Sequence, residues 1–177
     1  RSLTPLRAAG YELALPPRPG TWRVDPAGSF VQLCLRTLHR HSFFSAPVRQ
    51  GSTLLTEVAG TSAVDLRFGS HWTRRGTRQA VRWLDRQGFG SEEFPAMFGS
   101  SVLLASPDGW RMSGRLSAEH LDAVLVADAR ISAVRTQGNG HDAMLVHAVG
   151  AISRGQPLGV SDFTLGPRVA VRIRTRL

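Results

Sequence analysis

The chain has 177 residues, of which 42% are hydrophobic and 20% charged, a composition typical of one globular domain with its own core. No apolar run approaches the roughly 18 residues of a transmembrane helix, and the single cysteine, Cys34, excludes an internal disulfide and paired-cysteine zinc motifs. The formal net charge is +9 and every basic residue is an arginine. This charge favours anionic partners such as nucleic acid, phosphate groups or acidic membranes. No secretory signal is visible, which favours a cytoplasmic location over a periplasmic or secreted one.

The composition changes near residue 20. Residues 1–20 contain four prolines and two glycines and predict an N-terminal arm. A turn at residues 25–28 follows, and alternating patterns continue to the end of the chain. We therefore expect an arm over residues 1–20 and one domain over residues 21–177.

Alternation of apolar and polar residues predicts strands that bury one face. Val31, Leu33 and Leu35 share one face of the first long strand, with Gln32 and Arg36 on the other. Many short strands separated by Gly, Pro and Asn turns indicate an antiparallel sandwich or barrel. The other expected strands lie over residues 64–68, 109–117, 120–132, 143–153 and 168–177.

Two of these strands have informative faces. In residues 120–132, a face made of leucine and alanine lies opposite a mixed face of valine and charged residues. The final strand alternates Val169, Val171 and Ile173 with arginines. A nucleic-acid arm has no need of this alternation, whereas a closing barrel strand does, with its arginines on the outer face, where charge also discourages edge pairing.

One segment, residues 77–95, has helical spacing instead. Thr77 can cap the first turn, Ala80 and Leu84 lie on an apolar stripe, and Gly88 suits the left-handed residue that ends a helix. A single short helix between strands is therefore expected.

Arginines on this helix form one face because they are three or four residues apart. Arg75, Arg78 and Arg82 lie on it, close in sequence to Trp72 and Trp83. A solvated helix face is one interpretation. The others are contact with an anionic group, namely a ligand phosphate or an anionic membrane, or with a nucleic-acid backbone.

Motifs for catalysis or cofactor binding are missing from the sequence, which has no P-loop and no G-x-S-x-G elbow. His39 and His41 share a strand face, yet no third metal ligand is evident. Cys34 lacks a partner base in the sequence and is interpreted as a packed thiol. We expect no catalytic residues, no metal site and no cofactor.

Several segments together resemble the YceI-like family over residues 21–177. The first, residues 21–38, has the aromatic residue and the D-P-x-x-S motif that lead into the family's first long strand. Residues 84–104 are similar to its helix-to-strand block, and residues 109–125 and 148–160 to later strands. The matching positions are Trp22, Val24, Asp25, Pro26 and Ser29 in the first segment, and Phe89, Glu93, Phe94, Pro95 and Phe98 in the second.

The resemblance implies an eight-stranded antiparallel lipocalin-like barrel with one short helix between strands. It also implies non-enzymatic binding, sequestration or transport of an isoprenoid-like or other amphipathic lipid, and it allows a homodimer. An eight-stranded barrel can hold one slender ligand among its inward side chains. The candidate ligand-binding residues are Val31, Leu33, Leu35, Val64, Leu66, Phe68, Phe98, Val102, Leu104, Val169, Val171 and Ile173.

Two other functions remain open from the residues alone. A basic β-domain could bind nucleic acid or an anionic surface through the arginine-rich helix face, and nucleic-acid binding would weaken steeply with salt. An enzyme acting on a lipid would use the barrel as its pocket, but no acid–base or nucleophile set can be assembled.

Overall fold

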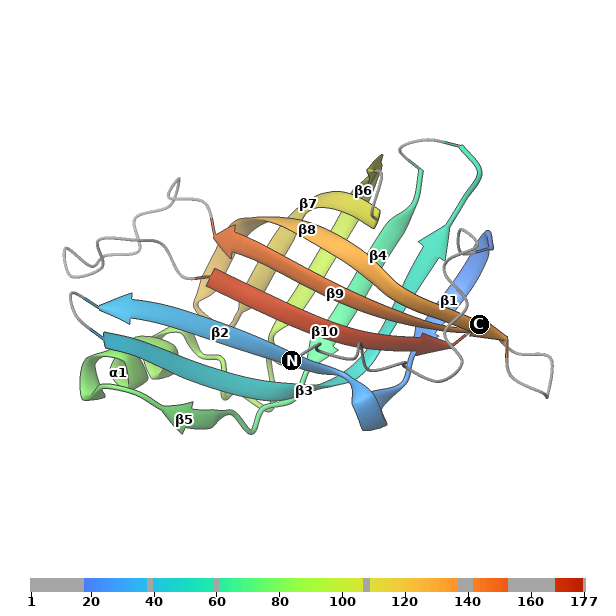
Figure 1. Cartoon of the computed structure of the whole chain (residues 1–177). Helices are drawn as coiled ribbons and strands as arrows, with labels where there is room; N and C mark the ends of the chain where they lie inside the picture. The colour runs from blue at the N-terminus through green and yellow to red at the C-terminus, as the bar shows by residue number, and fades with distance from the viewer. Residues whose placement is uncertain are drawn as a thin grey trace, which may run out of the picture.

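The structure, a computed structural model, describes residues 18–37, 40–58, 61–106, 109–136, 142–152 and 168–176. Of the expected N-terminal arm, only residues 18–20 fall within these ranges. One α-helix, α1 (Arg78–Gln87), and a short 3-10 helix (Pro26–Gly28) accompany the strands (Figure 1). The strands are β1 (Gly20–Val24), β2 (Phe30–Thr37), β3 (Arg40–Leu55), β4 (Ala63–Phe68), β5 (Thr73–Arg75), β6 (Met97–Ser106), β7 (Gly109–Ala118), β8 (Leu121–Thr136), β9 (Asp142–Ile152) and β10 (Arg168–Arg176).

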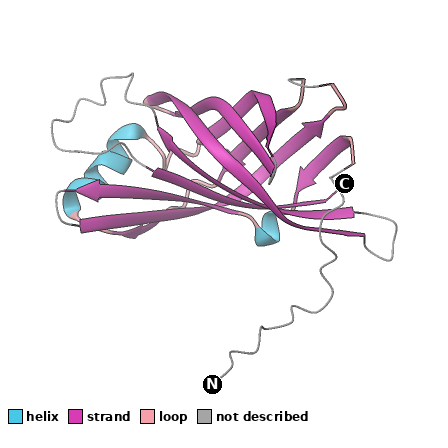
Figure 2. Cartoon of the chain, turned by 45° about the horizontal axis from the view of Figure 1, so that its top comes forward, coloured by secondary structure: helices cyan, strands magenta, loops and turns pink. Residues whose placement is uncertain are grey.

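Eight of these strands form a closed antiparallel ring. Pairing runs in the order β2–β3–β4–β6–β7–β8–β9–β10, and β10 then pairs with β2. Two strands lie outside the ring: β1 pairs with β3 and with the end of β10, and β5 pairs with β3. The chain's own strand pairing therefore confirms the predicted barrel with one short helix. Figure 2 shows α1 at one end of this curved sheet.

The core lies inside the ring because alternate residues of each strand point inward. Strand β4 has the plain alternation of buried and exposed residues, and β8 repeats it over Leu121–Arg130. In β8 the leucine–alanine face is the inner one, and Val124 and Val126 lie outside. The alternation predicted from the sequence therefore places the apolar face of each of these strands toward one shared core.

Helix α1 is fastened to the barrel at both ends. At its start, Thr77 Oγ1 accepts from the N–H of Ala80 (3.2 Å), and Thr77 N donates to Ser42 Oγ of β3 (3.1 Å). At its end, Gly88 adopts the left-handed conformation (φ 76°), and His120 N in the β7–β8 turn donates to Gln87 O (3.0 Å). The helix ends at Gln87 because the left-handed Gly88 turns the chain away from helical geometry, which confirms the predicted role of Gly88.

Replacing Gly88 by alanine is expected to lower the free energy of unfolding by about 1–2 kcal/mol. The residue has a positive φ, which a Cβ disfavours, and that Cβ would lie 2.5 Å from Cβ of Glu119. Gly90→Ala is the control, because its Cβ would meet no atom closer than 3.7 Å and its φ lies outside the left-handed region. Urea unfolding of both variants tests this, and equal stability of the two would contradict it.

A bulge in β6 corrects one sequence expectation. The β6–β7 register shifts between Gly99 and Val102, and Ser100 Oγ donates to Ser113 O (2.6 Å) inside the bulge. The extra residue reverses the facing of the positions that follow it. Leu103 is therefore buried and Leu104 is 53% exposed. The expected inward orientation of Leu104 is wrong.

Candidate functional site in the barrel

The barrel interior contains most of the predicted ligand-binding residues whose side chains are described. Each of these has at most 6% of its surface exposed. They come from β2, β4 and β6, so different strands contribute to one apolar interior. The residues are Val31, Leu33, Leu35, Val64, Leu66, Phe68 and Phe98.

Four other predicted residues can be placed only by backbone pairing. The side chains of Val102, Val169, Val171 and Ile173 lie outside the described part of the structure. In the register, Val169 pairs with Leu33, Val171 with Val31, and Ile173 with Val146. These pairings place the three β10 residues opposite buried residues of β2 and β9, whereas Val102 pairs with the exposed Ser113 after the β6 bulge, so its expected inward position is not supported by the register.

Sequence reasoning did not include a row of small residues in the lining. Strand pairing joins Ala129 to Ala148, then Ala148 to Val171, Val171 to Val31, and Val31 to Ala46. The four described members, Ala46, Val31, Ala129 and Ala148, are all buried. We call these four residues the small-residue band. Because alanine and valine side chains are short, the band extends less far into the interior than leucine or phenylalanine would.

Aromatic side chains close the end of the barrel beneath α1. Trp72 Nε1 donates to Phe89 O (2.9 Å), and the two rings meet edge to face at 5.2 Å. Trp83 packs on Phe89 at 5.9 Å and Phe68 on Trp72 at 6.3 Å. Such ring pairs stabilise the fold beyond the free energy gained by burying their apolar area. We call these four residues the aromatic cap.

The aromatic cap changes the interpretation of the nearby arginines. Trp72 and Trp83 are buried, with 7% and 1% of their surface exposed, so they cannot insert into a membrane from this position. The two tryptophans that lie close in sequence to these arginines therefore belong to the core and not to the basic surface. Any contact made by the helix arginines depends on charge and hydrogen bonding alone.

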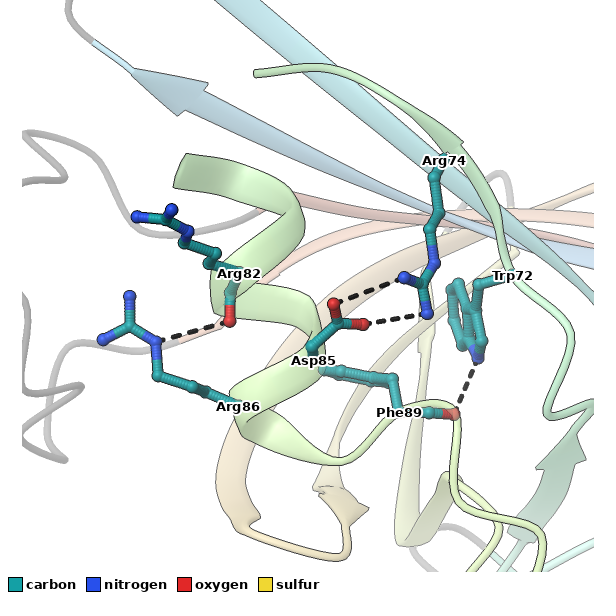
Figure 3. A network of polar contacts seen from close by, with 6 residues as sticks. All are labelled: Trp72, Arg74, Arg82, Asp85, Arg86 and Phe89. Atoms are coloured by element: carbon teal, nitrogen blue, oxygen red, sulfur yellow. Dashed lines mark hydrogen bonds and ion pairs between the residues drawn. The ribbon is translucent and has the colours of Figure 1, made fainter. Parts of the chain in front are cut away.

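The arginines of the helix region differ in their partners (Figure 3). Arg74 forms an ion pair with Asp85 (2.8 Å), and Arg86 Nε donates to Arg82 O (3.3 Å). Arg78 and Arg82 lie on α1, whereas Arg75 ends β5, so its predicted place on the helix is wrong. All three are exposed, and no carboxylate in the described part of the chain pairs with them. We call these three residues the arginine face.

Arginines on the outside of β7 contrast with that face because each has a carboxylate partner on β8. Arg111 lies 3.0 Å from Asp128, and Arg115 pairs with Asp122. The hydrogen bond from Arg115, helped by its charge, holds the pKa of Asp122 below its ordinary value. These guanidinium groups are already satisfied and offer less to a ligand than the arginine face does.

The interior offers apolar contact and a few hydroxyl groups. All buried polar residues among those described are serines or a threonine, and no buried side-chain N or O atom lacks a partner. The described residues contain no group of three His, Cys, Asp or Glu that could hold a metal ion. Cys34 Sγ lies 3.7 Å from His41 Nδ1, a contact that sequence spacing did not reveal. His39 lies outside the described residues.

Comparison with known proteins identifies similar structures. No family model matches the sequence, and no curated protein matches it either. BcnA of Burkholderia cenocepacia is 14% identical with a TM-score of 0.47, over 87% of this chain and 99% of BcnA. A YceI protein of Campylobacter jejuni is 12% identical with a TM-score of 0.48, over 100% of this chain and 98% of that one.

Solved YceI proteins are among the structures similar to this chain, as the sequence motifs predicted. At these identities the likeness concerns the fold and says nothing about the ligand. None of the described helices has both the length and the apolar character needed to cross a membrane.

Proposed function

We propose that this protein binds one amphipathic lipid, with the apolar tail inside the barrel and without chemical change to the ligand. The observation that carries this proposal is the small-residue band, in which short buried side chains pair in two sets, Ala129 with Ala148 and Val31 with Ala46, on strands that flank β10. An isoprenoid-like or fatty chain fits an interior of this kind, because its binding needs apolar contact rather than polar groups. Sequestration or transport of such a lipid is the proposed role.

The energetics of this mode of binding favour a long tail. Each buried methylene contributes about 0.8 kcal/mol, so a tail gains affinity with its length. The buried polar residues among those described are serines and a threonine and none is charged, so the interior fits a hydrocarbon better than a charged substrate. We propose a binding protein rather than an enzyme on this basis.

Salt dependence tests the proposal against nucleic-acid binding. Titration with a fluorescent long-chain fatty acid should show saturable one-to-one binding with nearly the same Kd at about 50 mM and about 200 mM salt. Nucleic-acid binding through many phosphate contacts would instead lose about a thousandfold or more over this range. Tight salt-sensitive binding of nucleic acid, with no uptake of the fatty acid, would reject the lipid proposal.

We also propose that the arginine face contacts an anionic membrane while the lipid is loaded. Arg75, Arg78 and Arg82 are exposed and without a carboxylate partner among the described residues. Each basic residue near an anionic surface contributes about 1 kcal/mol.

Changing these three arginines to serine should weaken binding to anionic vesicles by about a hundredfold. Vesicle cosedimentation measures this effect. The control changes Arg23, Arg111 and Arg130 to serine, which removes the same charge from other exposed positions. An equal loss in both triple variants would show a general charge effect and no specific face.

A further inference from the structure

A bulge in β3 places charged and polar side chains on the outside of the barrel. The β3–β4 register shifts between Val48 and Gln50, with Val48 opposite Phe68 and Gln50 opposite Arg67. Val48 is buried, whereas both Arg49 and Gln50 are exposed. The extra residue therefore places two consecutive polar side chains on the outer surface beside Arg67. Bulges re-aim side chains in this way and occur often next to functional sites.

These residues line a groove of about 350 Å³ between the β3–β4 pair and the segment that follows α1. Gly69 forms part of the groove, and a Cβ there would lie 2.9 Å from the Pro47 ring and 3.2 Å from Arg49 Nε. The Arg49 side chain, although exposed, therefore passes close to Gly69. A side chain at residue 69 would fill the position that the arginine occupies.

The groove has an excess of positive and hydrogen-bonding groups. No carboxylate in the described part of the chain forms an ion pair with Arg49 or Arg67. The Ser70 hydroxyl lies 3.2 Å from His71 Nδ1, and Ser91 Oγ accepts from Phe94 N (3.1 Å), which leaves the Ser91 hydroxyl hydrogen to donate.

One carboxylate, that of Glu92, is among the described residues of the groove. The groove lining thus contains two guanidinium groups and one carboxylate, which leaves an excess of positive charge. With the hydroxyl groups they form a set of donors that suits an anion with several acceptor oxygens.

We propose that this groove binds a phosphate group, as phosphate monoester or inorganic phosphate. Arginine recognises phosphate through paired N–H···O bonds that are shorter and stronger than those between neutral groups. The serine hydroxyls of the groove can donate further hydrogen bonds to the phosphate oxygens. The site is distinct from the barrel interior and from the arginine face, because its charged and hydrogen-bonding residues belong to neither of them, although Phe68 borders both the groove and the interior.

Titration of the isotope-labelled protein with inorganic phosphate, followed by NMR, tests the site directly. The amide signals of Gly69, Ser70 and His71 should shift with saturation. Arg49→Gln combined with Arg67→Gln should weaken the binding by about tenfold or more, because charge-assisted hydrogen bonds are lost. Arg23→Gln combined with Arg130→Gln removes the same charge at other exposed positions and should retain the wild-type affinity. Lysine at residues 49 and 67 keeps the charge without the paired geometry and should give an intermediate affinity.

A second arm distinguishes a soluble phosphate from a lipid headgroup. The same variants are mixed with phosphatidylcholine vesicles that contain or lack phosphatidic acid. Binding of either probe that depends on Arg49 and Arg67 supports the site, and the probe that binds identifies the source. The proposal is overturned if neither probe binds, or if the control pair loses as much affinity as the groove pair. Should the double variant lose its melting transition, Arg49→Gln and Arg67→Gln are compared singly.

Discussion

Replacing Ala148 by phenylalanine is expected to reduce the affinity for a long-chain lipid by about tenfold to a hundredfold without lowering the melting temperature. Ala148 is buried in the small-residue band and pairs with Ala129 on β8. A phenyl ring there would occupy the space of about two or three methylenes of the tail, each worth about 0.8 kcal/mol. The fluorescent fatty-acid titration measures the affinity, and a thermal melt measures the stability.

The melting temperature decides whether the interior has room. If packed side chains already filled the interior around Ala148, the ring would lower the free energy of unfolding by about 1–3 kcal/mol. The protein would then melt several degrees lower. Ala151→Phe is the matched control, because Ala151 lies on the same strand with its side chain exposed. A lower melting temperature for Ala148→Phe with unchanged lipid affinity would contradict a tail-binding interior.

Replacing Trp83 by alanine is expected to lower the free energy of unfolding by about 3–5 kcal/mol. The ring is 1% exposed and packs on Phe89, so its removal leaves a large void in the aromatic cap. Arg82→Ala is the control on the neighbouring residue, whose side chain is exposed, and it should change stability by less than about 0.5 kcal/mol. Urea unfolding followed by circular dichroism measures both.

The Trp83→Ala variant also tests whether the aromatic cap contributes to lipid binding. Because the aromatic cap closes one end of the barrel, its loss should also lower lipid affinity at temperatures where the protein is still folded. A loss of stability smaller than about 1 kcal/mol would show that Trp83 contributes little to the closure. Such a result would remove the cap from the account of the site.

Much of the fold follows from local patterns in the sequence. Val31, Leu33 and Leu35 alternate with polar residues, and a period of two predicts both the strand and its buried face. Thr77 and Gly88 mark the two ends of the helix because each suits a cap conformation. These features depend only on residues that are close in the sequence, so they can be predicted from it.

Features that depend on distant partners were missed. Leu103 replaces Leu104 in the core because an extra residue in β6 shifts the register against β7, and neither strand alone shows this. Trp72 and Trp83 are apolar on a basic segment, and only the barrel end beneath α1 makes them core residues. The small-residue band was found only in part: Val31 was predicted, but its proximity to Ala129 and Ala148 depends on β10, which pairs with both β2 and β9 although those strands are far apart in the chain.

Native mass spectrometry of the freshly purified protein, followed by organic extraction, tests the central claim most directly. The account predicts a single stoichiometric adduct with the mass of an isoprenoid or fatty-chain lipid, or its formation after lipid extract is added. Ala151→Phe should carry the same adduct, and Ala148→Phe should carry much less. A clean apo mass for the wild-type protein, with no uptake from added lipids, would contradict the binding of an apolar tail in the barrel.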